Sequence, residues 1–394
     1  MLRKRGHLLL IASVRNARKK SNRAHYWEDL WAAIIALPWG VGINRAAQEA
    51  AMIRKFKIQL FAGALLAALI GPTGANAASS GYHLLKTFKL GGDGGWDYLN
   101  LDPDSGNLFI TRGTHVMVVN PDSGKVVADI TDTPGVHGTL FLNGQAYISE
   151  GGANKLLVVD PKTFKKLSEI SVGAKPDGVL YDPVSKHIFT FNGGSKDATA
   201  VDPVTGRAMG TITLGGKPEA AVSDGAGTIF VNIETKSEVI AFDSTALKIK
   251  AHYPLAPCES PSGMTADMAH GRIFSGCDNA MVAVTDMKTG KVVAHFPIGD
   301  EVDANRFDAD TGLIFASNGE SGTLTVAKAV GSKYAVLDNV PTMKGARTME
   351  LDPKTHRVFV VAAPKLKPGT PTVWQPHPRP FAAEGSFSLL VLGR

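Results

Sequence analysis

Cysteine is scarce in this sequence, with two Cys among 394 residues. Zinc and iron–sulfur sites held mainly by thiolates need three or four cysteines, so the sequence excludes them. It also lacks a Gly-x-Ser-x-Gly elbow, a phosphate-binding P-loop and a Cys-x-x-Cys-His haem motif. The histidines beyond residue 77 form no HxH or HxxxH pair. Because no nucleophile and base stand at a recognisable spacing, we assign no catalytic residue and expect no cofactor.

Excess positive charge is missing from most of the chain, although the formal net charge is +6. Residues 1–77 hold 12 of the 42 Lys and Arg residues and three of the 36 Asp and Glu residues. Residues 78–394 therefore carry 30 basic and 33 acidic groups, a net charge of −3. A nucleic-acid-binding surface needs excess or clustered Lys and Arg. We therefore expect no nucleic-acid partner for this part of the chain.

Residues 52–77, MIRKFKIQLFAGALLAALIGPTGANA, have the pattern of a secretory signal peptide: a cationic start, an apolar run and small residues that end at Ala77. The apolar run is shorter than the roughly 20 residues that span a bilayer. We predict translation from Met52, with residues 1–51 an irregular extension produced by an over-extended gene prediction. Cleavage near Ala77 would release a periplasmic or secreted protein with no membrane attachment. The alternative is a cytoplasmic extension that ends in a signal-anchor helix.

A turn of the form apolar-Asp-Pro-x-x-Gly-x-apolar-Phe recurs every 39 to 44 residues beyond residue 80. In the seven successive repeats, the residue at the Asp position of this turn is Asp102, Asn143, Asp182, Asp224, Asp267, Asp308 and Asp352. Asp, Pro and Gly at these positions are typical of tight turns. A second series of turns runs out of phase with the first, at Asn120, Asp160, Asp202, Asp243 and Asp286.

Segments of five to seven residues rich in Val, Ile, Phe and Thr lie between these turns and are typical of strands. Each period then holds four strands, and seven periods of about 42 residues fill residues 78–394. This pattern predicts an all-β fold, a seven-bladed β-propeller of four-stranded blades. The last repeat lacks its outermost strand, which we expect residues 82–90, YHLLKTFKL, to supply. Such a closure joins the two ends of the domain.

The repeat resembles that of the YVTN family of seven-bladed propellers, and the periplasmic YncE-like proteins are the nearest type. The stretches that carry the resemblance are FITRGTHVMVVNPDSGKVV, YISEGGANKLLVVDPKTFKK, FVNIETKSEVIAFDSTALK and FASNGESGTLTVAK. The resemblance covers residues 82–394 and implies the architecture. It implies little about activity, because one propeller scaffold hosts many functions.

The loops that lead into the innermost strands are expected at one face of the propeller, around the central channel. Polar and aromatic residues of these loops predict a binding rim of mixed charge formed by Trp96, Asp97, His137, Asp177, Glu219, Arg306 and Arg347. The insertion 364–386 adds Trp374, His377 and Arg379 in a proline-rich stretch that we expect over the channel mouth near Trp96. The alternative is that these loops are simply solvated.

We assign no metal ligand. Asn192, Asn232 and Asn318 could imitate the oxygen-rich metal site of propeller lactonases, but asparagine there is part of the repeat consensus. We therefore favour a monomeric exported binding or scaffold protein for a small polar ligand, a peptide or a periplasmic protein. One alternative is a lactonase-type hydrolase with a divalent metal in the channel. The other is a structural subunit of a periplasmic redox dehydrogenase whose cofactor sits on a partner.

The two cysteines, Cys258 and Cys277, fall in the same repeat and map to the same face. In an oxidising compartment we expect them to form a disulfide. The alternatives are two unpaired thiols or a soft-metal pair.

Overall fold

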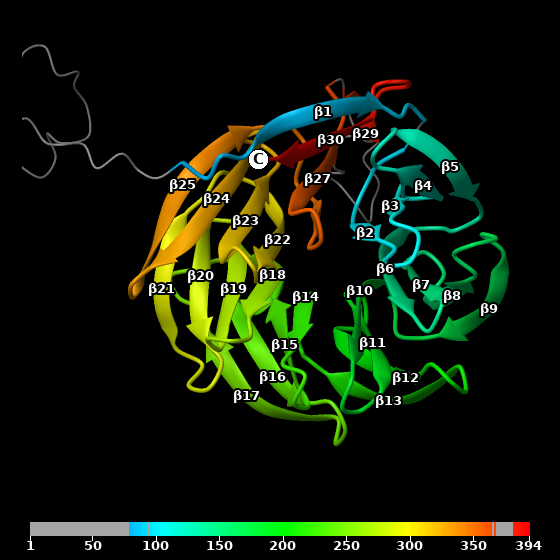
Figure 1. Cartoon of the computed structure of the whole chain (residues 1–394). Helices are drawn as coiled ribbons and strands as arrows, with labels where there is room; N and C mark the ends of the chain where they lie inside the picture. Colours follow the sequence, from blue (N-terminus) through cyan, green and yellow to red (C-terminus); the bar gives the residue numbers. More distant parts are fainter. Residues whose placement is uncertain (1–78, 93, 365, 368–380) are drawn as a thin grey trace, which may run out of the picture. The chain divides into compact units, whose positions relative to one another are not determined.

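The computed structural model describes residues 79–92, 94–364, 366–367 and 381–394. These residues form seven four-stranded antiparallel sheets, which Figure 1 shows arranged around a central axis, the channel axis of the propeller. The prediction of an all-β, seven-bladed propeller is confirmed. The predictions for the leader, residues 1–77, lie outside the described residues. In the described part of the chain, no helix has the length and apolar character needed to cross a membrane.

The blades are numbered here in chain order, and their strands are named from the channel outwards. Blades 1 to 3 consist of β2 (Leu99–Leu101), β3 (Leu108–Thr111), β4 (Val116–Asn120) and β5 (Lys125–Ile130); β6 (Val136–Leu142), β7 (Gln145–Glu150), β8 (Lys155–Val159) and β9 (Lys166–Ser171); and β10 (Pro176–Asp182), β11 (His187–Asn192), β12 (Asp197–Asp202) and β13 (Arg207–Thr213).

Blades 4 to 6 consist of β14 (Pro218–Ser223), β15 (Thr228–Ile233), β16 (Glu238–Asp243) and β17 (Lys248–Pro254); β18 (Pro261–Asp267), β19 (Arg272–Cys277), β20 (Met281–Asp286) and β21 (Val292–Pro297); and β22 (Val302–Asp308), β23 (Leu313–Asn318), β24 (Thr323–Val330) and β25 (Lys333–Pro341). Blade 7 consists of β26 (Met349–Asp352), β27 (Arg357–Ala362), β30 (Ser388–Gly393) and β1 (His83–Lys89).

The burial of each strand follows its place in the blade. The second strands are buried almost throughout, as in β23, whose six residues are all buried. Their two faces pack against the neighbouring blades, so the hydrophobic clusters lie between blades; one of them joins Phe315 of blade 6 to Val360 of blade 7. Outer strands face solvent, and β9 has one buried residue of six. A strand covered on both faces reads as a continuous apolar run, which is why these segments stand out in the sequence.

The predicted turns form at the ends of the inner strands. Asp102 accepts hydrogen bonds from the Asp104 N–H (3.2 Å) and the Ser105 hydroxyl (2.5 Å), and Gly106 follows with a φ of +69°. Asp352 makes the same turn with the Lys354 N–H (2.9 Å). A side chain that accepts from the backbone two residues ahead stabilises the turn locally. Each turn therefore forms from its own few residues.

Blade 7 is closed by the N-terminal strand, as predicted. Strand β1 pairs antiparallel with β30, from His83 opposite Gly393 to Lys89 opposite Ser388. Figure 1 shows β1 lying along the outer side of β30, beside the C-terminus. Just before β1, Tyr82 packs edge-on against Phe315 with ring centroids 5.0 Å apart. The first and last strands of the domain therefore share one sheet.

Cys258 and Cys277 form the predicted disulfide, with their Cα atoms 5.5 Å apart. It joins the loop before β18 to the end of β19, and both residues are buried. The described part of the chain contains no unpaired cysteine. The bond therefore ties the loop that leads into the channel to the second strand of blade 5.

Replacing both cysteines by alanine is expected to lower the free energy of unfolding by about 3 kcal/mol, because closing a loop of about 20 residues removes that much conformational freedom from the unfolded chain. The two cysteines are 19 residues apart. Urea denaturation of the variant and the parent protein would measure the difference. A variant as stable as the parent would show that the bond contributes nothing to stability.

Candidate functional site: the channel ring

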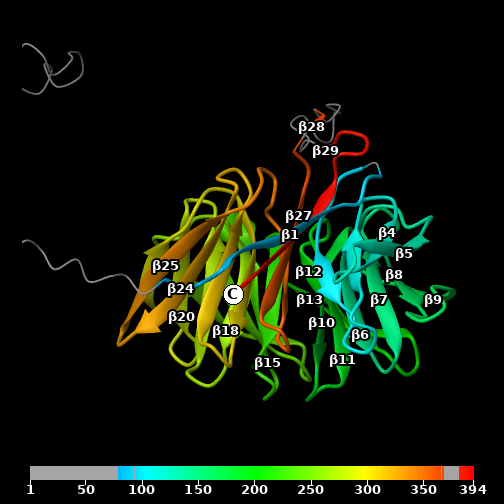
Figure 2. The same cartoon turned by 45° about the horizontal axis from the view of Figure 1, so that its top comes forward.

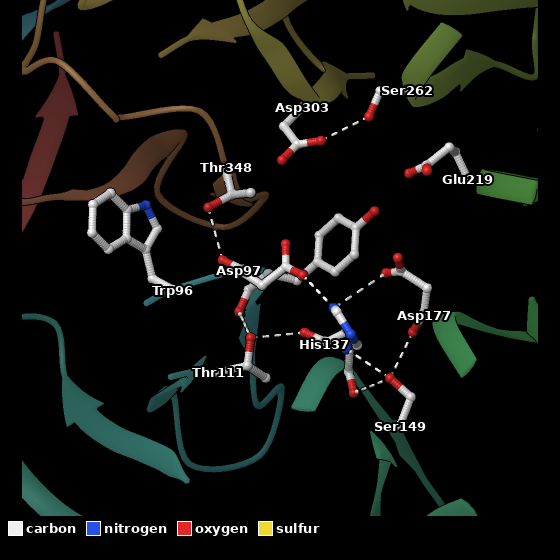
Figure 3. Close-up of polar contacts among 12 residues, drawn as sticks. Trp96, Asp97, Thr111, His137, Ser149, Asp177, Glu219, Ser262, Asp303 and Thr348 are labelled. Carbon is white, nitrogen blue, oxygen red and sulfur yellow. Dashed lines mark hydrogen bonds and ion pairs between the residues drawn. The ribbon is translucent and has the colours of Figure 1, made fainter. Parts of the chain in front are cut away.

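One residue from each blade lies at or just before the start of the inner strand. It stands five residues before the turn aspartate or, in blade 2, five residues before Leu142, the last residue of β6. We call these residues the channel ring: Asp97, His137, Asp177, Glu219, Ser262, Asp303 and Arg347. Figure 3 shows the ring residues of blades 1 to 6, from Asp97 to Asp303, with their side chains around one common space. Six of the seven ring residues carry ionisable side chains, whereas the strands beside them consist mainly of apolar residues.

In blades 2 to 6 a β-bulge in the inner strand redirects the side chain of the ring residue. In blade 3, Pro176 pairs with Asn192 and Val179 with Thr190, so Asp177 and Gly178 together oppose one residue of β11. The inner strands of blades 2, 4, 5 and 6 shift register at the equivalent place. A bulge places an extra residue in one strand and redirects its side chain. Without it, the alternation of the strand would point the ring residues elsewhere.

Hydrogen bonds between blades hold the ring residues in place. In several blades a polar side chain of the second strand donates to the backbone carbonyl of the next ring residue. These bonds run from Thr111 to the His137 carbonyl (2.8 Å), from Ser149 to the Asp177 carbonyl (2.6 Å) and from Asn232 to the Ser262 carbonyl (3.0 Å). Because each bond crosses a blade boundary, the ring positions depend on the assembled propeller.

His137 lies between two ring aspartates, as Figure 3 shows. Its Nδ1 is 2.6 Å from Asp97 Oδ2 and 3.9 Å from Asp177 Oδ1. Burial lowers the pKa of His137, but the charge of Asp177, the hydrogen bond and charge of Asp97, and the charge of Glu219 outweigh it and raise the pKa to about 9. The imidazole is therefore protonated at neutral pH and donates Nδ1–H to Asp97.

The free energy of unfolding is expected to decrease by about 1 to 2 kcal/mol between pH 6.5 and pH 9, a range that allows for screening of the partly exposed imidazole. His137 has its pKa raised to about 9 in the folded state, so its stabilisation is complete below 6.5 and is lost as the pH rises through 9. Urea denaturation at several pH values measures the slope of the free energy of unfolding against pH. In His137→Gln the slope should largely disappear; an unchanged slope would assign it to other groups.

The acidic part of the ring concentrates negative charge in a poorly solvated space. Burial raises the pKa of Asp177 to about 6, with His137 opposing the shift, and burial with the charge of Asp177 raises the pKa of Glu219 well above its usual range. Tyr98 lies among these groups. Burial and the charges of Asp177, Glu219, Asp97 and Asp303 raise the pKa of its hydroxyl well above 10. Lys217 balances part of this charge, since its Nζ is 2.5 Å from Glu219 and 2.7 Å from Glu234.

The opposite side of the ring holds a buried ion pair. The Arg347 Nε donates to Asp303 Oδ2 at 2.9 Å, and Ser262 donates to Asp303 Oδ1 at 2.7 Å. Arg347 also donates to the backbone carbonyl of Trp96 at 2.5 Å. Blades 5, 6, 7 and 1 are therefore linked through one network of polar side chains.

Five residues of the predicted rim come together in this ring: Asp97, His137, Asp177, Glu219 and Arg347. Trp96 forms the wall behind it: the side chain is buried, its N–H donates to the Gly345 carbonyl (3.1 Å), and it packs against Phe387. Arg306 lies three residues beyond the ring along β22, where its Nε donates to Glu350 at 2.9 Å. Trp374, His377 and Arg379 lie outside the described residues.

The ring contains two residues that sequence reasoning missed, Ser262 and Asp303. Counting five positions back from the turn aspartates Asp267 and Asp308 identifies both. The structure also places Asn192, Asn232 and Asn318 inside the blades, where all three are fully buried. Asn192, for example, donates to Asp197 at 2.7 Å. These asparagines support the repeat, in agreement with their place in its consensus.

The described base of the insertion 364–386 lies beside the ring. β28 (Leu366–Lys367) pairs with β29 (Phe381–Ala382), and Figure 2 shows both projecting from one end of the propeller. The Ala382 N–H donates to the Gly94 carbonyl at 3.3 Å. Arg112, fully buried, stacks on Phe387 at 3.6 Å and donates to the Gly95 carbonyl at 2.8 Å. Arg112 therefore anchors the loop that carries Trp96 and Asp97.

A cavity of about 510 Å³ opens at the other end of the inner strands. It is lined by the turns of Asp102 and Asp352, by Thr139 to Phe141 of β6, and by Glu350, the partner of Arg306. Its lining combines both charges with apolar side chains. None of the ring residues lines this cavity, so it is separate from the channel ring.

No protein-family model and no curated protein matches the chain. Solved structures do match its fold. Kuenenia stuttgartiensis hydrazine synthase aligns with a TM-score of 0.60 and 15% identity over 71% of this chain and 95% of that chain. A chain of a mitotic checkpoint complex gives a TM-score of 0.60 and 13% identity over 74% and 91%. U3-55K gives a TM-score of 0.62 and 11% identity over 81% and 99%. At these identities the likeness concerns the fold alone, a β-propeller.

Proposed function

We propose that this chain is an exported propeller of the YVTN type that holds a small, positively charged polar ligand in the channel ring. The single observation that carries the proposal is the ring itself, in which six of seven equivalent positions carry ionisable side chains. A repeated scaffold needs no charge at these positions. Charged groups that are taken out of water without full pairing are costly, and they cluster at functional sites.

The charge of the site favours a cation. With the neighbouring pair of Lys217 and Glu234, the site holds five acids, Asp97, Asp177, Glu219, Glu234 and Asp303, and three bases, His137, Lys217 and Arg347. Burial is the main cause of the raised pKa values of Asp177 and Glu219, and the neighbouring carboxylates raise both pKa values further. A cationic ligand would relieve this repulsion, whereas an anion would increase it.

Export is part of the proposal and is supported by the pattern of residues 52–77 and by the disulfide. Expression of the full gene in a bacterium, followed by fractionation and mass spectrometry, tests it. We expect the protein in the periplasm or medium with its N-terminus near Ala78. An intact chain retained in the cytoplasm would contradict export.

Ligand binding is tested by the melting temperature of the purified protein with millimolar arginine, spermidine or ethanolamine, and with glutamate or citrate as matched anions. We expect at least one organic cation to raise the melting temperature, because a ligand that binds only the folded state stabilises it. Glu219→Gln should weaken the shift, and Asp310→Asn, in an exposed turn, should not. Shifts with anions alone, or equal losses in both variants, would contradict the proposal.

A lactonase-type hydrolase is the second candidate. It is favoured by one observation: Asp97, His137 and Asp177 present metal-ligating atoms within 4.8 Å of one another in the channel. A metal there would polarise a carbonyl and activate water. Hydrolysis of δ-gluconolactone in the presence of Zn²⁺ or Mn²⁺, lost in Asp177→Asn, would support it. No hydrolysis above the metal alone would reject it.

A further inference from the structure

We propose that Asp97, His137 and Asp177 bind a divalent transition-metal cation through Asp97 Oδ2, His137 Nδ1 and Asp177 Oδ1. This inference deepens the proposed function, because it names a ligand class for the same ring. The three residues come from blades 1, 2 and 3 and occupy successive ring positions. Figure 3 shows the three side chains pointing toward one another.

The spacing of the three atoms fits one metal ion. All of them lie within 4.8 Å of one another; Asp97 Oδ2 is 2.6 Å and Asp177 Oδ1 is 3.9 Å from His137 Nδ1. Metal–ligand bonds of about 2.0 to 2.2 Å place neighbouring ligands roughly 3.0 to 3.5 Å apart. The two observed separations lie on either side of this range. Small rotations of the two carboxylates would therefore complete the geometry.

Asp177 supplies a second, independent observation. Its Oδ1 is closed to solvent and has no hydrogen-bond partner among the described residues. The nearest charged nitrogen is His137 Nδ1, at 3.9 Å, which is beyond hydrogen-bond distance. A buried carboxylate oxygen without a donor is costly. A cation between Asp177 and His137 would satisfy this oxygen.

The imidazole is held in the orientation that such a site requires. The Cα of Gly151 lies so close that a Cβ there would be 2.9 Å from His137 Nε2 and 3.0 Å from Cδ2. Any larger residue at position 151 would push the ring away. The glycine therefore lets His137 present Nδ1 to both aspartates.

The donor set selects the class of metal. One imidazole nitrogen with two carboxylates suits Zn²⁺, Mn²⁺ or Fe²⁺, whereas Ca²⁺ and Mg²⁺ prefer oxygen ligands alone. Binding would replace the Nδ1 proton, which would leave to solvent, by a metal–nitrogen bond. Three protein ligands would leave coordination positions open toward the channel.

A second cluster in the described chain has the same residue types but a different role. Asp308, Asp310 and His356 also bring their ligand atoms within 4.8 Å. There the oxygens of Asp308 already accept from the Asp310 N–H (3.2 Å) and Thr311 (2.7 Å), and Asp310 is exposed. This cluster joins two turns of the repeat, because His356 Nδ1 in the blade 7 turn lies 2.8 Å from Asp308 Oδ2 in the blade 6 turn. It serves as the matched control.

The test is isothermal titration of the purified, metal-stripped full-chain protein with ZnCl₂ and MnCl₂. We expect one equivalent to bind to the parent protein and to Asp310→Asn. Asp177→Asn and His137→Gln should each weaken binding by more than about 100-fold, because each removes a direct ligand. Circular dichroism melting shows whether each variant is folded. Co²⁺ gives a readout of the ligand set: its visible bands should appear with the parent protein and be lost in His137→Gln.

Two outcomes would overturn the metal site: no stoichiometric metal bound to the folded parent, or equal weakening in Asp310→Asn and the ring variants. If organic cations still shift the melting temperature through Glu219 in a protein that binds no metal, the metal inference fails and the proposed function stands. If neither kind of cation binds, both fail.

Discussion

Replacing Arg347 by methionine is expected to lower the free energy of unfolding by about 3 to 5 kcal/mol. The guanidinium is 9% exposed and donates to Asp303, which is 10% exposed, and to the Trp96 carbonyl. Without Arg347, the Asp303 carboxylate would remain buried next to an uncharged side chain, and the contact between blades 7 and 1 would lose one of its hydrogen bonds. Urea denaturation followed by circular dichroism measures the loss.

Arg357→Met is the matched control for Arg347. Its hydrogen-bonded partner Asp122 is 69% exposed, and its second partner, the buried Asp352, is 3.8 Å away and accepts hydrogen bonds from its own turn, so we expect a loss below about 1 kcal/mol. The double variant Arg347→Met with Asp303→Leu should recover part of the stability, because the buried carboxylate that Arg347 balances is removed as well. Equal losses at Arg347 and Arg357 would show that burial of the ion pair is not what matters.

Tyr82→Ala is expected to destabilise the domain by about 3 to 5 kcal/mol, the usual cost of truncating a buried aromatic residue. Tyr82 is 6% exposed, packs against Phe315 of blade 6 and donates its hydroxyl to the His356 carbonyl at 2.6 Å. Burial raises the pKa of Tyr82 to about 12, so the hydroxyl stays protonated and keeps this bond. The residue therefore secures the strand that closes blade 7.

Tyr82→Phe separates packing from hydrogen bonding. It keeps the ring and removes the hydroxyl, so we expect a loss of about 1 kcal/mol. Leu84→Ala, two residues further on in β1 and 42% exposed, should change little. Thermal and urea denaturation of the three variants test the order. If Tyr82→Ala were as stable as Leu84→Ala, the closing strand would contribute little to the fold.

The repeat explains why so much of the fold could be predicted. Each turn is stabilised by its own residues, as Asp102 and Gly106 illustrate, and each second strand is apolar because both of its faces are covered. Such signals are local, and they recur seven times. Blade number, strand order, the closing strand and the disulfide could therefore be predicted without a structure.

The channel ring could be predicted only in part. Asp97, His137 and Asp177 were recognised as polar residues at the starts of inner strands. Asp303 was missed and Arg306 was chosen, because the alternation of β22 does not reveal the register shift between Val302 and Ala304. Counting back from the turn aspartate gives the position, but a bulge redirects the side chain through pairing with another strand, and that pairing exists only in the assembled sheet.

The amino-acid sequence by itself determined the seven blades and their closure, because turn chemistry and apolar alternation act between residues that are near in the chain. Only the tertiary structure decided which side chains meet in the channel. Asp97, His137 and Asp177 are 40 residues apart from one to the next, and they come together because three blades pack side by side. The buried oxygen of Asp177, which has no hydrogen-bond partner among the described residues, is likewise a product of that packing.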